Sequence, residues 1–184
     1  MIKERIALSG DLKHKIMSCM HYANYYEGRA VDITIAQQYF AQHGHPMLKS
    51  TARFYRKFFG LCCEWYLDFT NLKAAADFEF ALFPYLINGI KDHLADAYFR
   101  DMNGESLAQI EQLAQQRCQG IGLIGYYYPA EIFISEHSML YAKYEYQEEI
   151  ECFPDIFALL ERELRQCKLN AVAMKSVKAL DGKL

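Results

Sequence analysis

The sequence lacks the features that mark export, membrane insertion or a strongly charged partner. No apolar run in its 184 residues is as long as a membrane span. The N-terminal segment MIKERIALSGDLK carries charges where a secretory signal would be apolar. The net charge is only −3, so the total charge by itself points to no partner. We therefore expect a cytoplasmic protein that does not contact a membrane.

The six cysteines show no C-x-x-C spacing, so the sequence indicates neither a zinc site nor a redox pair. Cys62 and Cys63 are adjacent, but they stand in a segment that alternates like a strand, and successive strand residues face opposite sides of a sheet. The two thiols thus cannot bind one metal ion together, and a disulfide between neighbours would be strained. We expect reduced cysteines, with Cys63 buried as a small apolar side chain, and neither a metal nor a cofactor.

No motif indicates a catalytic centre. His43 and His45 flank a helix-ending glycine, and no cysteine or carboxylate close in sequence completes a metal site, so a solvated loop is the preferred interpretation. The glycines of GIGLIG (120–125) lack the spacing and the strand-to-helix context of a phosphate-binding loop. A thiol–histidine hydrolase would need a nucleophile turn that the sequence does not show. We expect no enzymatic activity and no catalytic or cofactor-binding residues.

Length and composition favour one domain. Hydrophobic residues make up 52% of the chain and aromatic residues 15%, enough for a large aromatic core. A chain of 184 residues is only marginally long enough for two domains. We assign residues 1–168 to a single domain and residues 169–184 to a C-terminal tail or an extension of the last helix.

Residues 61–69 alternate strictly between apolar and polar side chains. This period predicts a strand with one buried face. Trp65 and Leu67 are expected to be buried, and Glu64 and Asp68 to be exposed. A hairpin to a second strand over residues 78–82 is plausible.

The rest of the chain changes between helical and alternating periods. Helices are predicted over residues 9–27, 32–44, 48–59 and 84–99, from a capping box at Ser106 to about residue 120, and from Pro154 onward. Further strands are predicted over residues 121–127, 131–135 and 139–146. This order predicts an α+β fold in which a mostly antiparallel sheet is flanked by N-terminal and C-terminal helices.

Five short blocks occur in an order that resembles the SUKH superfamily of immunity proteins, its third subfamily in particular. They are GRAVDI (28–33), ARFYRKFFGL (52–61), GLIG (122–125), IFISEHSMLYA (132–142) and FPDIFALLERELR (153–165). The resemblance covers roughly residues 10–166, and it depends on the order and spacing of the blocks. Ser138 departs from the pattern, because the hairpin turn there usually has glycine, which adopts positive φ at little cost.

The resemblance implies a SUKH-like domain in a bacterial cytoplasmic protein. Such a protein binds and neutralises a cognate protein toxin, commonly a nuclease or a deaminase, and has no enzymatic activity. Two alternatives stay open: a non-catalytic adaptor or regulator of the same fold, since a fold does not determine function, and, more distantly, an enzyme of unrecognised type. The sequence leaves the oligomeric state open.

Charge is segregated along the chain. Between Glu131 and Glu163 nine acidic residues stand against Lys143 and Arg162, a net charge of −7, so the remainder carries +4. One interpretation is a solvated loop with acids at a helix N-terminus; the other is a partner-binding surface. The candidate partner-binding residues are Tyr144, Glu145, Tyr146, Glu148, Glu149, Glu151 and Asp155.

A basic cluster lies on the predicted third helix, at Lys49, Arg53, Arg56 and Lys57. Such a cluster can bind nucleic acid. The first two helices supply no matching basic face, so a solvated helix surface is the preferred interpretation. We expect no direct contact with nucleic acid.

Overall fold

The structure is a computed structural model. It describes residues 3–6, 9–69, 74–82, 100, 102–126, 129–165 and 169–176. Side-chain surroundings are described for residues 9–61, 82, 100, 102–125 and 129–165. The predicted helix over residues 84–99 lies outside this part of the chain.

Eight strands of the described chain form one sheet in the order β1-β8-β2-β3-β4-β5-β6-β7. All neighbouring strands are antiparallel. The predicted hairpin is confirmed, since β2 pairs with β3 from Cys62–Ala81 to Phe69–Ala74. The strands are β1 (Lys3–Ile6), β2 (Cys62–Phe69), β3 (Ala74–Leu82), β4 (Cys118–Tyr126), β5 (Ala130–Ser135), β6 (Leu140–Lys143), β7 (Glu151–Phe153) and β8 (Leu169–Ser176).

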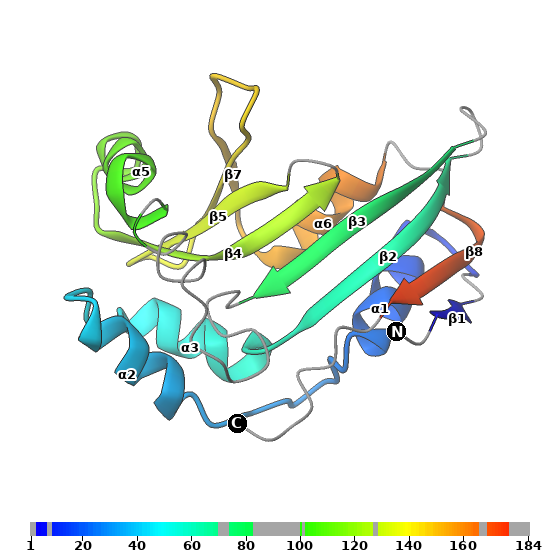
Figure 1. The fold of residues 1–184 in the computed structure, drawn as a ribbon, viewed down its shortest axis with the longest axis horizontal. Helices are drawn as coiled ribbons and strands as arrows, with labels where there is room; N and C mark the ends of the chain where they lie inside the picture. The colour runs from blue at the N-terminus through cyan, green and yellow to red at the C-terminus, as the bar shows by residue number, and fades with distance from the viewer. Residues whose placement is uncertain are drawn as a thin grey trace.

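The helices complete an α+β fold. They are α1 (Leu12–Tyr22), α2 (Thr34–Gln42), α3 (Lys49–Phe58), α5 (Leu107–Ala114) and α6 (Ile156–Arg165), with a π-helical turn η1 (Met102–Ser106) before α5. In Figure 1, α1 and α6 lie behind the sheet and contact each other, whereas α3 lies beside its lower left edge, where it contacts β5. No helix of the described residues is long and apolar enough to cross a membrane.

Local hydrogen bonds explain where two helices begin. The Asp11 carboxylate caps α1 by accepting from the backbone N–H of His14 at 2.9 Å. Just before α2, the Asp32 carboxylate accepts from the N–H of Thr34 at 3.0 Å, while Ile33 is the N-cap residue and makes no side-chain cap hydrogen bond. The capping box predicted at Ser106 is wrong. Ser106 is helical and makes no cap hydrogen bond, because it ends the π-helical turn; its hydroxyl accepts from Lys143 instead, at 2.9 Å.

Three strands were missed by the periodicity. The predicted helical or frayed tail does not hold over residues 169–176, which form β8 between β1 and β2. Its Ala, Lys and Met residues favour helix locally, but pairing with two distant strands overrides that propensity. β1 and the three-residue β7 are too short to show a period. The predicted strand at 61–69 is confirmed as β2, whereas the burial predicted for its side chains lies outside those described.

Hydrogen bonds from α3 and the loop before it attach this helix to β4. Gln119 on β4 is 3% exposed. Its side-chain oxygen Oε1 accepts from the backbone N–H of Leu48 at 2.8 Å, and its side-chain Nε2 donates to the backbone carbonyl of Pro46 at 2.9 Å. About two helical turns after Leu48, the buried hydroxyl of Tyr55 donates to the carbonyl of Ile121 at 2.8 Å. The backbone groups involved are thus satisfied away from water, and the position of α3 is set.

We expect Gln119→Leu to destabilise the fold by about 1–3 kcal/mol, because it leaves the N–H of Leu48 and the carbonyl of Pro46 without their buried partner. Urea unfolding measures the change. The control is Gln112→Leu, an exposed position on α5, which should stay within about 0.5 kcal/mol of the parent. Equal effects of the two substitutions would contradict the assigned role of Gln119.

Candidate interaction surfaces

Residues 145–150 form an acidic loop between β6 and β7. Drawn in gold, this loop projects beyond the end of the sheet (Figure 1). Glu145, Glu148 and Glu149 are exposed, and Tyr146 between them is 73% exposed. The loop therefore presents three carboxylates around one large aromatic ring.

A cluster of four side chains lies at the base of this loop: Tyr144, Glu151, Arg162 and Glu163. The hydroxyl of Tyr144 donates to Glu163, and the guanidinium of Arg162 lies 4.8 Å above the Tyr144 ring. Arg162 donates to Glu163 at 3.0 Å and from Nε to Glu151 at 2.9 Å, with a second, shorter contact to Glu151. This base cluster connects both ends of the acidic loop to α6.

Burial governs the protonation of the base cluster. Glu163 is only 6% exposed, and desolvation raises the pKa of its carboxyl group, although Tyr144 and Arg162 partly offset the effect. Burial, together with the hydrogen bond to Glu163, also raises the pKa of Tyr144 above its usual range. Tyr144 thus stays a neutral hydrogen-bond donor to the carboxylate.

The seven candidate partner-binding residues fall into three places. Glu145, Tyr146, Glu148 and Glu149 share the acidic loop, whereas Tyr144 and Glu151 are held in the base cluster by Arg162 and Glu163. Asp155 belongs to neither group: it accepts from the N–H of Ala158 at 2.9 Å in the first turn of α6.

Sequence reasoning missed Arg162 and Glu163 as the residues that hold the base of the loop. A signal was present, because Glu163 follows Leu159 and Leu160 by four and three residues on the apolar face of α6. A charged residue at a core position needs a buried partner.

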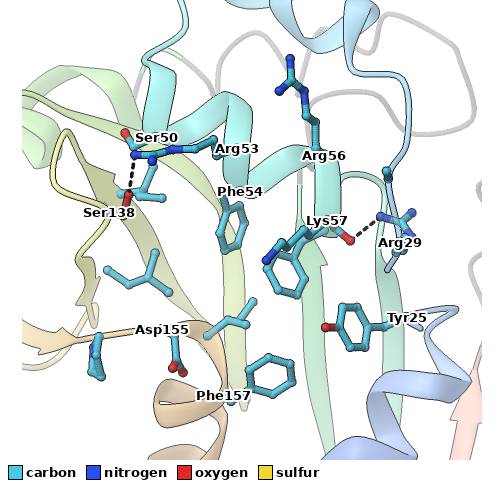
Figure 2. A pocket seen from close by; sticks show the side chains of 16 residues that line it. Tyr25, Arg29, Ser50, Arg53, Phe54, Arg56, Lys57, Ser138, Asp155 and Phe157 are labelled. Carbon is cyan, nitrogen blue, oxygen red and sulfur yellow. Dashed lines mark hydrogen bonds between the residues drawn. The ribbon is translucent and has the colours of Figure 1, made fainter. Parts of the chain in front are cut away.

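A groove of about 690 Å³ lies between α3, the start of α6 and the β5–β6 turn. Figure 2 shows it from close by. We call it the basic groove, because four basic side chains and one acidic side chain line it: Arg29, Arg53, Arg56, Lys57 and Asp155. Its apolar wall consists of Tyr25, Phe54, Phe58, Ile134, Leu140, Ile156 and Phe157.

Arg29 reaches the groove from the loop before α2 and closes the C-terminal end of α3. Its guanidinium donates to the carbonyls of Lys57 at 2.7 Å and Phe59 at 2.8 Å. Burial lowers the pKa of Arg29, and the last carbonyls of a helix are a favourable site for a cation. Arg29 is therefore committed to structure, and it brings a basic residue of another segment to the helix that carries the predicted basic cluster.

At the other end of the groove, Arg53 extends from α3 to the β5–β6 turn. It donates to the hydroxyl of Ser138 at 3.3 Å, a contact drawn in Figure 2. Ser138 has φ +68°, so it adopts the left-handed conformation for which glycine is usual in this turn. The turn thus keeps a positive φ at Ser138, and this residue adds a hydroxyl to the groove.

The described residues include no group of three His, Cys, Asp or Glu side chains that could hold a metal ion. His43 is turned to its own helix: its Nδ1 lies 2.8 Å from the carbonyl of Tyr39. Among the described thiols, Cys19, Cys118 and Cys152 are free. Burial raises the pKa of Cys19 and of Cys118 to about 12, so these two are protonated at neutral pH.

Comparisons with protein-family models, with curated proteins and with solved structures found no significant match to this chain. The two surfaces are therefore interpreted from their own chemistry and from the motif order.

The base cluster predicts different effects for two tyrosines that stand two residues apart. Tyr144→Phe removes a hydroxyl donor from a buried carboxylate and should cost about 1–3 kcal/mol of unfolding free energy. Tyr146→Phe, at an exposed position, should change it by less than about 0.5 kcal/mol. Urea unfolding at neutral pH measures both; a loss confined to Tyr146→Phe would show that the cluster does not stabilise the fold.

The raised pKa of Glu163 predicts a pH dependence. As pH rises above the unfolded-chain value of 4.5, the unfolded chain releases this proton before the folded chain does. The group's contribution to stability therefore falls as pH rises from there through the higher pKa of the folded state. Glu163→Gln removes this titration. We therefore expect the urea midpoint of the variant minus that of the parent to increase as the pH is raised from 4 to 8. A difference that stays constant or reverses over this range contradicts the assignment, and Glu148→Gln on the acidic loop is the control.

Proposed function

We propose that this chain is an immunity protein that binds and neutralises a cognate protein toxin in the bacterial cytoplasm without catalysing a reaction. The observation that carries the proposal is the acidic loop: three exposed glutamates around an exposed tyrosine, on a loop whose two ends are held by the base cluster. The order of motifs that resembles SUKH immunity proteins directs the proposal to toxin inhibition rather than to another kind of acidic binding surface.

A nuclease toxin is the best electrostatic match for this loop. An enzyme that binds phosphates has a positively charged cleft, and opposing charge on an inhibitor raises the association rate. Exposed charges are screened over about 8 Å at physiological salt. Electrostatic attraction between exposed charges therefore does not by itself keep the two proteins bound. A contact from which water is excluded is also required.

Tyr146 supplies that contact. Tyrosine is enriched among the residues that dominate binding energy at interfaces, because its ring buries a large area and its hydroxyl keeps a polar contact. Tyr146 lies between Glu145 and Glu148, so the ring would enter an interface surrounded by carboxylates. Glu151 is paired with Arg162, and we assign it to the support of the loop rather than to the contact.

The test begins with the gene neighbourhood: we expect a gene for a secreted toxin beside the gene for this chain, and its toxin domain is the probe. Bacteria that express this domain should grow only when the chain is co-expressed. Glu145, Glu148 and Glu149 changed together to Lys should slow association with the purified toxin domain by about tenfold or more at low salt, and the difference should shrink as salt is raised. Stopped-flow mixing measures the rate.

The matched control reverses three exposed carboxylates elsewhere, Glu27, Glu105 and Glu136, and so changes the net charge equally. It should slow association much less than the loop variant. If both variants slow association equally, the slowing reflects the net charge of the chain and not the acidic loop. A chain that fails to protect, or a gene with no secreted toxin beside it, contradicts toxin neutralisation and favours an adaptor role.

A further inference from the structure

We propose that the basic groove is a binding site for a small aromatic carboxylate. The groove carries charge of the opposite sign to the acidic loop, so its ligand is not the partner proposed for the loop. The inference does not depend on toxin neutralisation.

The groove has the size and the shape of a small-molecule site. Its volume of about 690 Å³ is within the range of roughly 300–1,000 Å³ usual for such sites, which are mostly apolar with a few polar groups that orient the ligand. Here the apolar wall comes from α3, α6, β5, β6 and Tyr25 after α1, while most of the basic side chains lie along α3 (Figure 2).

The wall of the groove is aromatic. The Phe58 ring lies 4.7 Å from Phe54, 5.4 Å from Tyr25 in a stacked arrangement, and 6.2 Å from Phe157 in an edge-to-face one, measured between ring centroids. Ring centroids at these separations attract one another. An aromatic ligand ring would extend this cluster, whereas an aliphatic chain would gain only the apolar area.

One polar group at the groove has no hydrogen-bond partner within the part of the chain that the structure describes. It is the side-chain oxygen of Ser50, a residue that is 1% exposed although it lines the groove. A helical serine commonly donates to the carbonyl four residues back. For Ser50 that residue is Pro46, which precedes α3 and whose carbonyl accepts from Gln119. A ligand oxygen in the groove would give the hydroxyl its missing acceptor.

Two cations follow this hydroxyl along α3, Arg53 by about one helical turn and Lys57 by about two. Arg53 follows Ser50 by three residues and so lies on the same helix face, with Ser138 as its described hydrogen-bond partner. In Figure 2 the Lys57 ammonium is directed toward the middle of the groove. Within the described chain, neither Arg53 nor Lys57 forms an ion pair. A planar carboxylate fits the fork of donors on Arg53.

Asp155 on the opposite wall limits the charge of the ligand. Its carboxylate is held at the start of α6 by the N–H of Ala158 and cannot turn away without losing that cap. A ligand with two negative charges would meet repulsion there. The groove therefore suits a monoanion, a carboxylate rather than a phosphate monoester.

The experiment titrates the full chain with N-acetylphenylalanine and follows binding by isothermal titration calorimetry. Three probes serve as matched controls: the neutral amide of the same compound, N-acetylglycine, which keeps the carboxylate but lacks the ring, and phenyl phosphate. We expect N-acetylphenylalanine to bind more tightly than each of them. Equal binding of the acid and the amide, tighter binding of phenyl phosphate, or no binding of any probe overturns the proposal.

Variants locate the site. Arg53→Gln should raise the dissociation constant about tenfold, the effect of losing one charge-assisted hydrogen bond. Lys49→Gln, at an exposed position of the same helix that does not line the groove, should change it less than about twofold. Equal effects of the two variants place the carboxylate elsewhere. Tight binding of a single-stranded oligonucleotide that depends on Arg56 would instead assign this basic face to nucleic acid.

Ser50→Ala separates a ligand contact from a structural one. Removing a buried hydroxyl that has no partner should leave the urea midpoint unchanged or higher, while binding of N-acetylphenylalanine weakens. A variant that binds the probe as tightly as the parent shows that the hydroxyl does not contact the ligand and overturns its place in the site.

Discussion

The hydrogen bonds that satisfy the backbone at the two ends of α3 are the constraint on which both the fold of this region and its groove depend. Gln119 accepts from Leu48 and donates to Pro46 at the N-terminal end, and Arg29 donates to the carbonyls of Lys57 and Phe59 at the C-terminal end. Buried backbone groups without partners are costly. The helix therefore has one position relative to β4, and its basic residues are presented beside an aromatic wall rather than distributed in solvent.

Buried polar groups also need partners at the base of the acidic loop, where the buried group is a carboxylate. Glu163 is placed on the apolar face of α6, where its carboxylate needs donors, and Tyr144 and Arg162 provide them. Because Arg162 also binds Glu151, the two strands that flank the loop are joined to one helix. The loop carries exposed like charges that repel one another, and the charges that would otherwise be isolated at its base are paired.

Local sequence patterns predicted those elements whose stability is local. The helices α1, α2, α3 and α6 and the strand β2 follow from apolar periods and from caps such as Asp11. The strand β8 could not be predicted in this way, because its pairing with β1 and β2 joins residues at opposite ends of the chain. Ser106 also shows that a distant contact can override a local pattern. Its spacing to Gln109 fits a capping box, but its hydroxyl accepts a hydrogen bond from Lys143 on β6 instead.

The candidate interaction surfaces likewise combine features that the local sequence indicates with features that depend on distant residues. The charge count indicated the exposed glutamates of the acidic loop, but the strand predicted over residues 139–146 was too long, because β6 ends at Lys143. The roles of Tyr144 and Glu151 depend on two residues of α6, Arg162 and Glu163, to which the charge count assigned no role. The basic groove was not predicted at all. Its cations were recognised on α3, but Arg29, Ser138 and Phe157 come from three other segments, and no period along one segment shows that they converge.

The hydroxyl of Ser50 does not contribute to the stability of the fold, although it lies at the groove. A buried hydroxyl without a partner costs free energy relative to an apolar side chain of the same size, and alanine has a higher helix propensity than serine. Neither term favours serine in the folded chain, and the bonds that position α3 are made by Gln119, Tyr55 and Arg29 instead. Thr51, the next residue, also has a buried oxygen without a hydrogen-bond partner among the described residues, but it does not line the groove. The hydroxyl of Ser50 is therefore a group that a ligand can use without loosening the helix that carries it, because it makes no hydrogen bond to any described residue that would have to break when the ligand binds.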